Sequence, residues 1–285
     1  MTGRGRDEGV VLVNVLVVLA IAGGLMLLII SGRDRALSRV SQAADAAIAE
    51  QIAVGAEASV IDALRSDLDQ APDADHLNES WALSVIQTET ELPTGRFSVN
   101  IEDMQAKFNI NQLADLTAGT QVFANRLMQA VDQPPEAVNQ ITRLLQAIGP
   151  VGALEDLEGY GVPPETVTAL APYVTALPLP GTVNLNSVGP FLLEVMLQNP
   201  GQTSQLIRQR DNRGFLTIDS LRKIGALRPQ NSGFTSNVFR VEIFAEAGSA
   251  RIAFETVLVR SNSAGVKSVD VHSRRLRSPI PLPPK

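Results

Sequence analysis

The chain has 285 residues, with no cysteine and two histidines, and its 24 basic and 30 acidic side chains give a formal net charge of −6. The lack of cysteine excludes disulfide bonds and thiolate chemistry, and His76 and His272 lie too far apart in the sequence to form a metal-binding motif. A negative net charge argues against a nucleic-acid-binding surface, which needs a basic face.

The N-terminus joins a charged leader, residues 1–9, to the apolar segment Val10–Ile30, in which Asn14 is the only polar side chain. At about 1.5 Å per residue this segment would form a helix about 30 Å long, the thickness of a bilayer's hydrocarbon core. It is longer than the apolar region of a secretory signal, and no small-residue cleavage site follows it. The arrangement resembles a type IV prepilin leader, in which the cut would follow Gly9 and leave Val10 as the mature N-terminus. An ordinary uncleaved membrane anchor is the alternative.

The helix is predicted to continue beyond the membrane, because the stretch from Ala36 to Leu68 lacks proline and is rich in helix formers. Its apolar residues recur at intervals of three and four and predict one apolar face: Leu37, Val40, Ala44, Ala47, Ile48, Ile52, Ile61, Leu64 and Leu68. We therefore expect one long helix that packs on another element through its distal half and ends at Pro72. Arginines flank the apolar segment on both sides, so the positive-inside rule does not orient it.

Two blocks of strands are predicted on either side of a central region. The first is a hairpin formed by Trp81–Ile86 and Arg96–Ile101. The second block, recognised by alternating apolar and polar residues, contains Asn237–Ala247, Ala250–Val259 and Val266–His272. An antiparallel sheet made from these strands could bury the apolar face of the long helix. The proline-rich tail, residues 278–285, is predicted to be disordered.

The region between the strand blocks, from about residue 112 to residue 228, has a helical pattern with short helices. The proline pairs Pro134-Pro135 and Pro163-Pro164 mark helix starts, where a missing N–H is tolerated. The predicted helices are Gln112–Val131, Pro135–Ile148, Leu154–Glu158, Pro164–Ala176, Pro190–Gln198, Thr203–Asp211 and Ile218–Ile224. Strands, helices and strands in this order predict an α+β fold, in which a large all-helical domain is inserted between the strand blocks of a helix-and-sheet domain.

A weak internal repeat supports this organisation, since Phe108-Asn109-Ile110-Asn111 recurs as Val183-Asn184-Leu185-Asn186. In an extended segment the middle apolar residue would be buried, and the second asparagine could cap the helix that follows. Asparagine oxygens also suit calcium, which stays an open alternative. However, the neighbouring carboxylates are too scattered for a metal site to be assigned: Glu102, Asp103 and Asp115.

Several segments, in the same order along the chain, resemble the general secretion pathway protein K family, the large minor pseudopilin of type II secretion systems. They are Glu8–Val13, Lys107–Leu113, Leu154–Val162, Leu170–Pro178 and Thr182–Ser187. The resemblance implies a pilin-like helix-and-sheet domain with a helical insertion. The implied division is leader 1–9, transmembrane helix 10–30, pilin-like helix and first strands 31–110, inserted helical domain 111–235, remaining strands 236–275 and disordered tail 276–285.

The same resemblance implies a role in assembly, with neither enzymatic activity nor a cofactor. The chain would be a single-pass protein of the bacterial inner membrane with its globular part in the periplasm. Prepilin peptidase would cut it after Gly9. It would then cap a short pseudopilus together with two smaller minor pseudopilins, above the major pseudopilin and the inner-membrane assembly platform. Exported proteins are further partners, and no nucleic acid is expected.

Asn14 would occupy the fifth position of the mature chain, where most pilins have a glutamate that pairs with a neighbour's N-terminal ammonium group. An unpaired charge inside a helix bundle in the membrane costs several kcal/mol, so interior subunits need this pair. The resembled family lacks the glutamate, and Asn14 therefore predicts a position at the filament tip. Gly23 and Gly24 would allow partner helices to approach closely.

Three other functions fit parts of the sequence. A minor pilin of a type IV pilus-like system would have the same leader and span. A membrane-anchored helix-hairpin-helix nucleic-acid-binding protein is suggested by the glycine turns at 148–152 and 224–227, but acidic residues surround the first turn. A membrane-anchored enzyme is disfavoured because no nucleophile elbow, zinc helix, phosphate loop or carboxylate pair is present.

Overall fold

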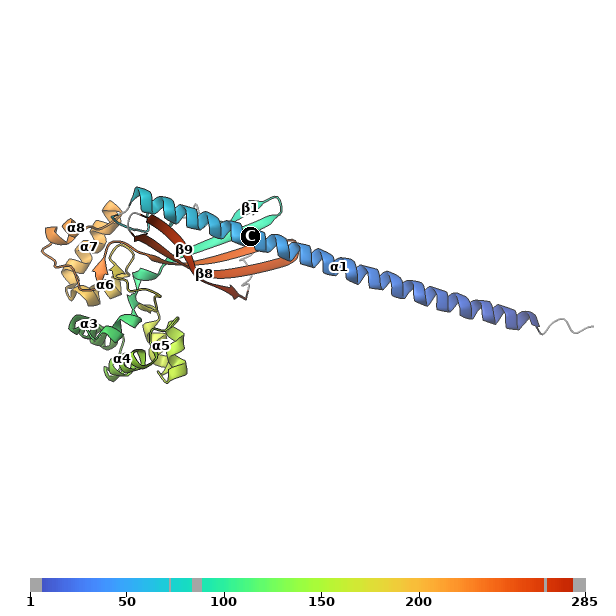
Figure 1. Cartoon of the computed structure of the whole chain (residues 1–285), viewed down its shortest axis with the longest axis horizontal. Helices are drawn as coiled ribbons and strands as arrows, with labels where there is room; N and C mark the ends of the chain where they lie inside the picture. The colour runs from blue at the N-terminus through green and yellow to red at the C-terminus, as the bar shows by residue number, and fades with distance from the viewer. Residues whose placement is uncertain (1–6, 72, 84–88, 264–265, 279–285) are drawn as a thin grey trace, which may run out of the picture.

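The computed structural model describes residues 7–71, 73–83, 89–263 and 266–278. The leader residues 1–6, Pro72, residues 84–86 of the predicted first strand and residues 279–285 of the tail lie outside these ranges. One helix forms a long shaft, a sheet packs along its C-terminal part, and a group of short helices lies beyond the end of the shaft (Figure 1).

The shaft is helix α1 (Asp7–Gln70), which runs without a break over 64 residues. At about 1.5 Å per residue it is about 95 Å long. The predicted continuity of the apolar segment Val10–Ile30 with the helix that follows it is therefore confirmed. Alanine and the other helix formers of this helix explain the continuity, since its distal half contains no proline and a single glycine, Gly55.

The prediction of a single apolar face on α1 is wrong, because the apolar residues form two stripes. Ile52, Leu64 and Leu68 belong to the stripe that is buried against the sheet, whereas Leu37 and Val40 are each 68% exposed. Contacts of α1 reach strands β2, β7, β8 and β9. Spacings of three and four residues fit both stripes, so periodicity alone did not separate them.

The sheet has five antiparallel strands in the order β1-β2-β7-β8-β9. Their bounds are β1 Thr90–Leu92, β2 Gly95–Asp103, β7 Val238–Ala247, β8 Ala250–Ser263 and β9 Val266–Arg277. Strand β7 alternates buried and half-buried residues, as its sequence predicted. The hydrophobic core between α1 and the sheet includes Ala53, Val60, Val99, Val241 and Ile243.

The first predicted strand is displaced in the structure. Trp81–Leu83 form a turn, and the strand that pairs with β2 is Thr90–Leu92. Trp81 is fully buried in the core beneath α1, with its ring edge-on to Phe239 at a centroid distance of 5.1 Å. The apolar character of this segment therefore reflects the insertion of Trp81 into the core rather than the pairing of a strand.

The helical region lies between β2 and β7 and has its own hydrophobic core, which includes Phe108, Leu127, Ile141, Leu157 and Leu193. Its α-helices are α3 Ala118–Ala130, α4 Glu136–Ile148, α5 Pro164–Leu170, α6 Pro190–Leu197, α7 Pro200–Arg213 and α8 Ile218–Lys223. Short 3-10 helices precede and separate them: η1 Met104–Ala106, η2 Ile110–Asp115 and η3 Leu154–Tyr160. The predicted α+β fold, with helices placed between two strand blocks, is confirmed.

Two details of the helical region differ from the sequence prediction. The first predicted helix is split into η2 and α3, because Leu116 between them adopts a left-handed conformation with φ of 52°. Helix α5 ends at Leu170 because the chain then enters strand β4 (Val174–Thr175), which pairs in parallel with β3 (Phe108–Asn109). A second parallel pair joins β5 (Val183–Asn184) to β6 (Ser232–Gly233).

Candidate functional site

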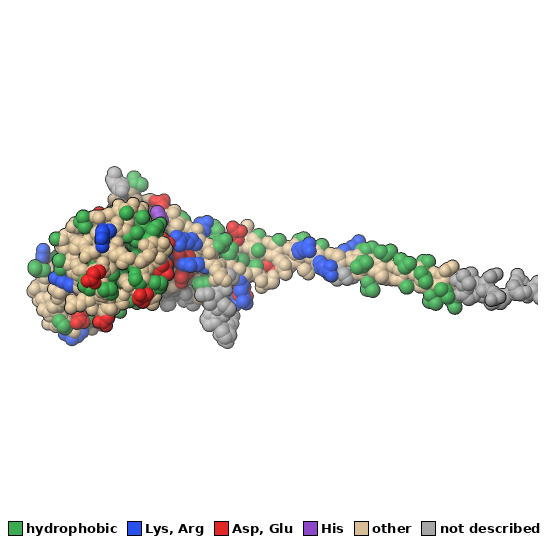
Figure 2. All heavy atoms as spheres, turned by 90° about the horizontal axis from the view of Figure 1, so that it is seen from below, with side chains coloured by type: hydrophobic (Ala, Val, Ile, Leu, Met, Phe, Trp, Pro, Cys, Tyr) green, Lys and Arg blue, Asp and Glu red, His purple; other side chains and the backbone are tan. Residues whose placement is uncertain are grey.

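The N-terminal half of α1 is an apolar surface that the described part of the chain leaves uncovered. Its segment Leu12–Ile29 has a mean hydropathy of 2.8 with no part buried, and is long and apolar enough to cross a membrane. Figure 2 shows apolar side chains along this part of the shaft, with Lys and Arg side chains where it ends. Asn14 lies exposed within the segment, while Gly9 and Val10 lie in the first turns of α1.

The exposed apolar stripe continues from this segment along α1. It consists of Leu37, Val40, Ala44, Ala47, Val54 and Ala58, all of which are exposed. At 100° per residue these positions lie on the side of α1 opposite the residues that pack on the sheet. Their alternating spacing of three and four, with Gln51 at the one polar position, is the pattern of a helix that packs against another helix.

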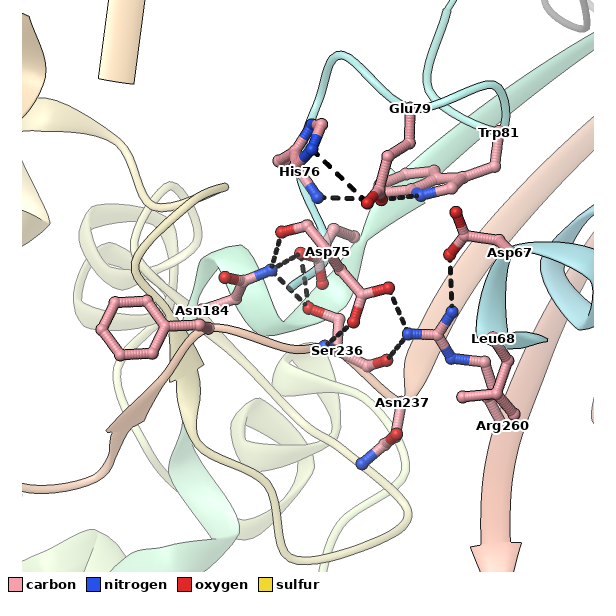
Figure 3. A network of polar contacts seen from close by, with 12 residues as sticks. Asp67, Leu68, Asp75, His76, Glu79, Trp81, Asn184, Ser236, Asn237 and Arg260 are labelled. Carbon is pink, nitrogen blue, oxygen red and sulfur yellow. Dashed lines mark hydrogen bonds and ion pairs between the residues drawn. The ribbon is translucent and has the colours of Figure 1, made fainter. Parts of the chain in front are cut away.

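A second concentration of unusual residues lies where the helical region meets α1 and the sheet. We call it the polar joint, and Figure 3 shows most of its members. It consists of Asp67, Asp75, Glu79, Asp103, Asn184, Ser236 and Arg260, all of which are buried. They come from the end of α1, the segment 73–83, the end of β2, strand β5, the residues before β7, and β8.

Arg260 is the centre of the polar joint. Its Nη1 donates to Oδ2 of Asp67 over 2.9 Å, and its Nη2 donates to Oδ1 of Asp75 and, over 2.7 Å, to the carbonyl of Ser236. The guanidinium also lies over the ring of Phe239, 5.2 Å from its centroid. One arginine therefore connects the last turns of α1 with the segment 73–83 and with the chain that returns from the helical region.

Asn184 and Ser236 extend these contacts to Asp103. The amide of Asn184 donates to the Asp75 carbonyl and to Oδ2 of Asp103, over 3.0 and 3.1 Å, and the Ser236 hydroxyl donates to the same Asp103 oxygen over 2.6 Å. Burial raises the pKa of Asp103, while these donors oppose the rise. Asp103 is also the N-cap of η1, accepting from the N–H of Gln105.

The segment 73–83 supplies the remaining acidic residue, Glu79. Its Oε2 accepts from the Trp81 indole over 2.7 Å and from the His76 N–H over 3.0 Å, whereas its buried Oε1 accepts no hydrogen bond from the described residues. The ring of His76 stacks on Phe215 of the helical region with centroids 5.0 Å apart, and burial lowers the pKa of His76. His76 thus touches both the joint and the helical region.

Asp67, Asp75 and Glu79 are close enough to hold a metal ion, since one oxygen of each lies within 4.8 Å of the others. Two of the three, Asp67 and Asp75, instead bind the guanidinium of Arg260. Both oxygens of Asp75 already accept, Oδ1 from Arg260 and Oδ2 from the Ser236 N–H, and Asp67 shares the same arginine. A divalent ion at this position would face the positive charge of Arg260.

The asparagines of the internal repeat, considered above for calcium, have their amide oxygens in use by backbone donors. Asn109 and Asn184 each accept from the N–H two residues ahead, so the first asparagine rather than the second bonds the following turn. The prediction that the second asparagine caps a helix is wrong. The predicted burial of the middle residues is confirmed, since Ile110 and Leu185 are 2% and 0% exposed.

The second asparagines perform the same task in the two halves of the helical region. Asn111 accepts from the N–H of Val151 and donates to its carbonyl, both over 3.0 Å. Asn186 does the same with Leu216, over 2.6 and 3.4 Å. Each half also closes with a parallel strand pair, β3 with β4 and β5 with β6. The two halves of the helical region therefore share the same asparagine contact and the same kind of strand pair.

No protein-family model and no curated protein matches this sequence. A solved structure does: a chain of the GspK-GspI-GspJ complex from the type 2 secretion system of enterotoxigenic Escherichia coli, with a TM-score of 0.60. The match covers 87% of this chain and 100% of that chain, at 18% sequence identity. This chain has a pseudopilin-like fold. The pseudopilin-like fold agrees with the family resemblance drawn from the sequence segments.

The polar joint was not predicted from the sequence, although β8 contains one signal of it. The inward-facing positions of this strand are Phe254, Thr256, Leu258 and Arg260, so a charged residue continues a row of core positions. Buried arginines need anionic partners, but the strand pattern does not show which carboxylates supply them. Asp67 and Asp75 lie 193 and 185 residues away in the sequence.

Proposed function

We propose that this chain is a minor pseudopilin at the tip of a type II secretion pseudopilus, where it is needed for pseudopilus assembly and for export of folded proteins across the outer membrane. The observation that carries the proposal is the structural match to a chain of the GspK-GspI-GspJ complex over its full length. An apolar N-terminal span continuous with a helix packed on an antiparallel sheet supports it. The work of such a subunit is assembly and requires no catalytic group.

The proposal assigns roles to the N-terminal residues. Gly9 would precede the cut made by prepilin peptidase and Val10 would become the new N-terminus. Asn14 would mark a subunit that need not pair with the ammonium group of a neighbour, as is acceptable at the end of a filament. The span would anchor the chain in the inner membrane, with the sheet and the helical region in the periplasm. The division of the chain into domains given above belongs to the same proposal, except that the last strand extends to Arg277, where β9 ends, and not to residue 275.

The exposed stripe on α1 is proposed to contact the helices of the partner pseudopilins. Its small residues, Ala44, Ala47 and Ala58, allow another helix to approach closely, and Leu37 and Val40 would bury most of their exposed surface. The stripe continues the membrane span, so a partner anchored in the same membrane could pack along both. Partners anchored in this way would be the two smaller pseudopilins of the tip and the major pseudopilin below it.

The first experiment measures the N-terminus of the chain by mass spectrometry after extraction from membranes with an active prepilin peptidase. Loss of residues 1–9 is expected in the wild-type protein, and Gly9→Ala should retain them. Gly5→Ala, the same substitution elsewhere in the leader, is the matched control and should be cut normally. A wild-type chain that keeps its leader would refute the pseudopilin assignment.

The second experiment uses the absence of cysteine in the chain. Val40→Cys introduces a unique thiol on the exposed stripe, and Ser38→Cys places one on the opposite side of α1 two residues away; both positions are exposed. With single cysteines in the membrane-proximal helices of co-expressed minor pseudopilins, disulfide formation is expected for Val40→Cys and not for Ser38→Cys. Equal cross-linking at the two positions would refute the contact through the stripe. Export of a secreted protein measured in the same cells separates this role from that of a type IV pilus subunit.

A further inference from the structure

The polar joint contains more buried negative than positive charge. Asp67, Asp75, Glu79 and Asp103 are each at most 8% exposed, and Arg260 is the cation buried among them. Nε2 of His76 lies 3.5 Å from Oε1 of Glu79, but burial lowers the pKa of His76 and so disfavours the charged ring that would compensate the carboxylates. A buried charge without a partner costs several kcal/mol, and a carboxyl group avoids that cost by binding a proton.

The hydrogen bonds show where such a proton belongs. Asp75 accepts at both oxygens, from Arg260 and from the Ser236 N–H, and Asp103 accepts from several donors. Asp67 accepts only at Oδ2, from Arg260, and Glu79 accepts only at Oε2. In the described part of the chain, Oδ1 of Asp67 thus accepts no hydrogen bond, and Oε1 of Glu79 has Nε2 of His76 at 3.5 Å without forming a hydrogen bond to it. Figure 3 shows the second oxygen of Asp67 on the side of Glu79 and Trp81.

We propose that Asp67 and Glu79 share one proton, and that this proton holds the polar joint closed. One carboxylate oxygen of each residue lies within 4.8 Å of one oxygen of the other, so two ionised groups would repel each other and one proton relieves that repulsion. The proton then removes one negative charge and supplies the missing donor. The polar joint is closed when its hydrogen bonds are formed. Because these bonds connect α1, the segment 73–83 and β8 to Asn184 and Ser236, they determine how firmly the helical region is attached to the sheet.

The titration of Asp67 follows from the groups around it. Burial, then the charge of Glu79, then that of Asp75 raise the pKa of Asp67 to about 7, while Arg260 lowers it. Burial also raises the pKa of Glu79. From the neighbouring strand β9, Lys267 pairs with the more exposed Asp69 and with the Leu68 carbonyl rather than with Asp67. The excess charge is therefore not neutralised from that side.

The raised pKa of Asp67 fixes the direction of the pH dependence. A carboxyl group whose pKa is raised on folding binds its proton more tightly in the closed state than in the open one. Its contribution to stability is complete below the ordinary value of 3.8 and is lost as the pH rises to about 7. The protection of the joint against opening should fall about tenfold per pH unit across this window and then level off above it.

Hydrogen–deuterium exchange of the full chain in detergent, from pH 5 to pH 8.5, measures this protection after correction for the intrinsic exchange rate. Wild type should lose protection in residues 73–83 and 234–237 up to about pH 7. Asp67→Asn keeps an oxygen for Arg260 and supplies a permanent N–H donor to Glu79, so its protection should stay high and independent of pH. Asp69→Asn, on the exposed neighbour in the same helix turn, is the matched control and should behave as wild type.

Glu79→Gln provides a second test in case Asp67→Asn does not fold, because a glutamine at this position donates to Asp67 and should also flatten the profile. The infrared absorption of a protonated carboxyl group should be present at pH 5.5 in wild type and weaker in both variants. Protection that is independent of pH in wild type, or an unchanged profile in both variants, would overturn the proposal. A profile that disappears when calcium is removed with a chelator would overturn it as well, since the ligand would then be a metal ion.

Discussion

Replacing Arg260 by methionine tests whether the polar joint holds the fold together. The side chains of Arg260, Asp67 and Asp75 are 2%, 5% and 1% exposed, so the ion pairs are fully buried. Methionine fills a similar space but leaves two buried carboxylates without their cation. Removing one partner of a buried pair destabilises a protein by about 3–5 kcal/mol. We expect a loss of this size in the free energy of unfolding, measured by urea denaturation of the full chain in detergent at pH 7.5.

Two comparisons make this prediction specific. Arg251→Met, on the same strand, removes a pair with Glu246 at a side chain that is 51% exposed, and should cost less than about 1 kcal/mol. Lowering the pH should recover part of the stability of Arg260→Met, because the stranded carboxylates then become neutral. The double variant Arg260→Met with Asp75→Asn should likewise be more stable than the single variant. A loss below about 1 kcal/mol for Arg260→Met would refute the reasoning.

Three further changes test other parts of the fold by the same unfolding measurement. Asn186→Ala should cost about 3 kcal/mol, because it leaves the buried N–H and carbonyl of Leu216 without partners; Asn139→Ala at an exposed position is its control. Trp81→Ala should cost about 3–5 kcal/mol for the cavity left beneath α1, and a loss under about 1 kcal/mol would contradict its place in the core. Gly95→Ala should cost about 1–3 kcal/mol, since its Cβ would lie 2.1 Å from the Glu246 carbonyl, whereas Gly159→Ala, with nothing within 4 Å, should be neutral.

The regular elements could be predicted from the sequence because their signals are local. The proline pairs located the starts of α4 and α5, and the alternation of β7 gave its bounds to within one residue. The long helix followed from composition and the absence of proline. These features depend on neighbours within a few residues, so one sequence contains the information.

What the sequence could not give depends on contacts between distant residues. The apolar residues around Trp81 fit a strand as well as a buried turn, and only the space beneath α1 decides between them. The second stripe of α1 is distinguished from the first only by the sheet, which covers the opposite side of the helix. The polar joint joins residues nearly 200 positions apart, and each of its carboxylates read alone is indistinguishable from a solvated one.

The position of the insertion explains why a polar joint lies where it does. The helical region leaves the sheet after β2 and returns at β7, and these neighbouring strands pair at Asp103 and Phe239. The chain therefore enters and leaves the helical region at the same end of the sheet. Apolar contacts alone would allow the helical region to rotate about this connection. Hydrogen bonds from Arg260, Asn184 and Ser236 have fixed directions and therefore select one orientation. In the proposed role at the end of a filament, such a fixed orientation would be needed, and a purely hydrophobic joint would define it less well.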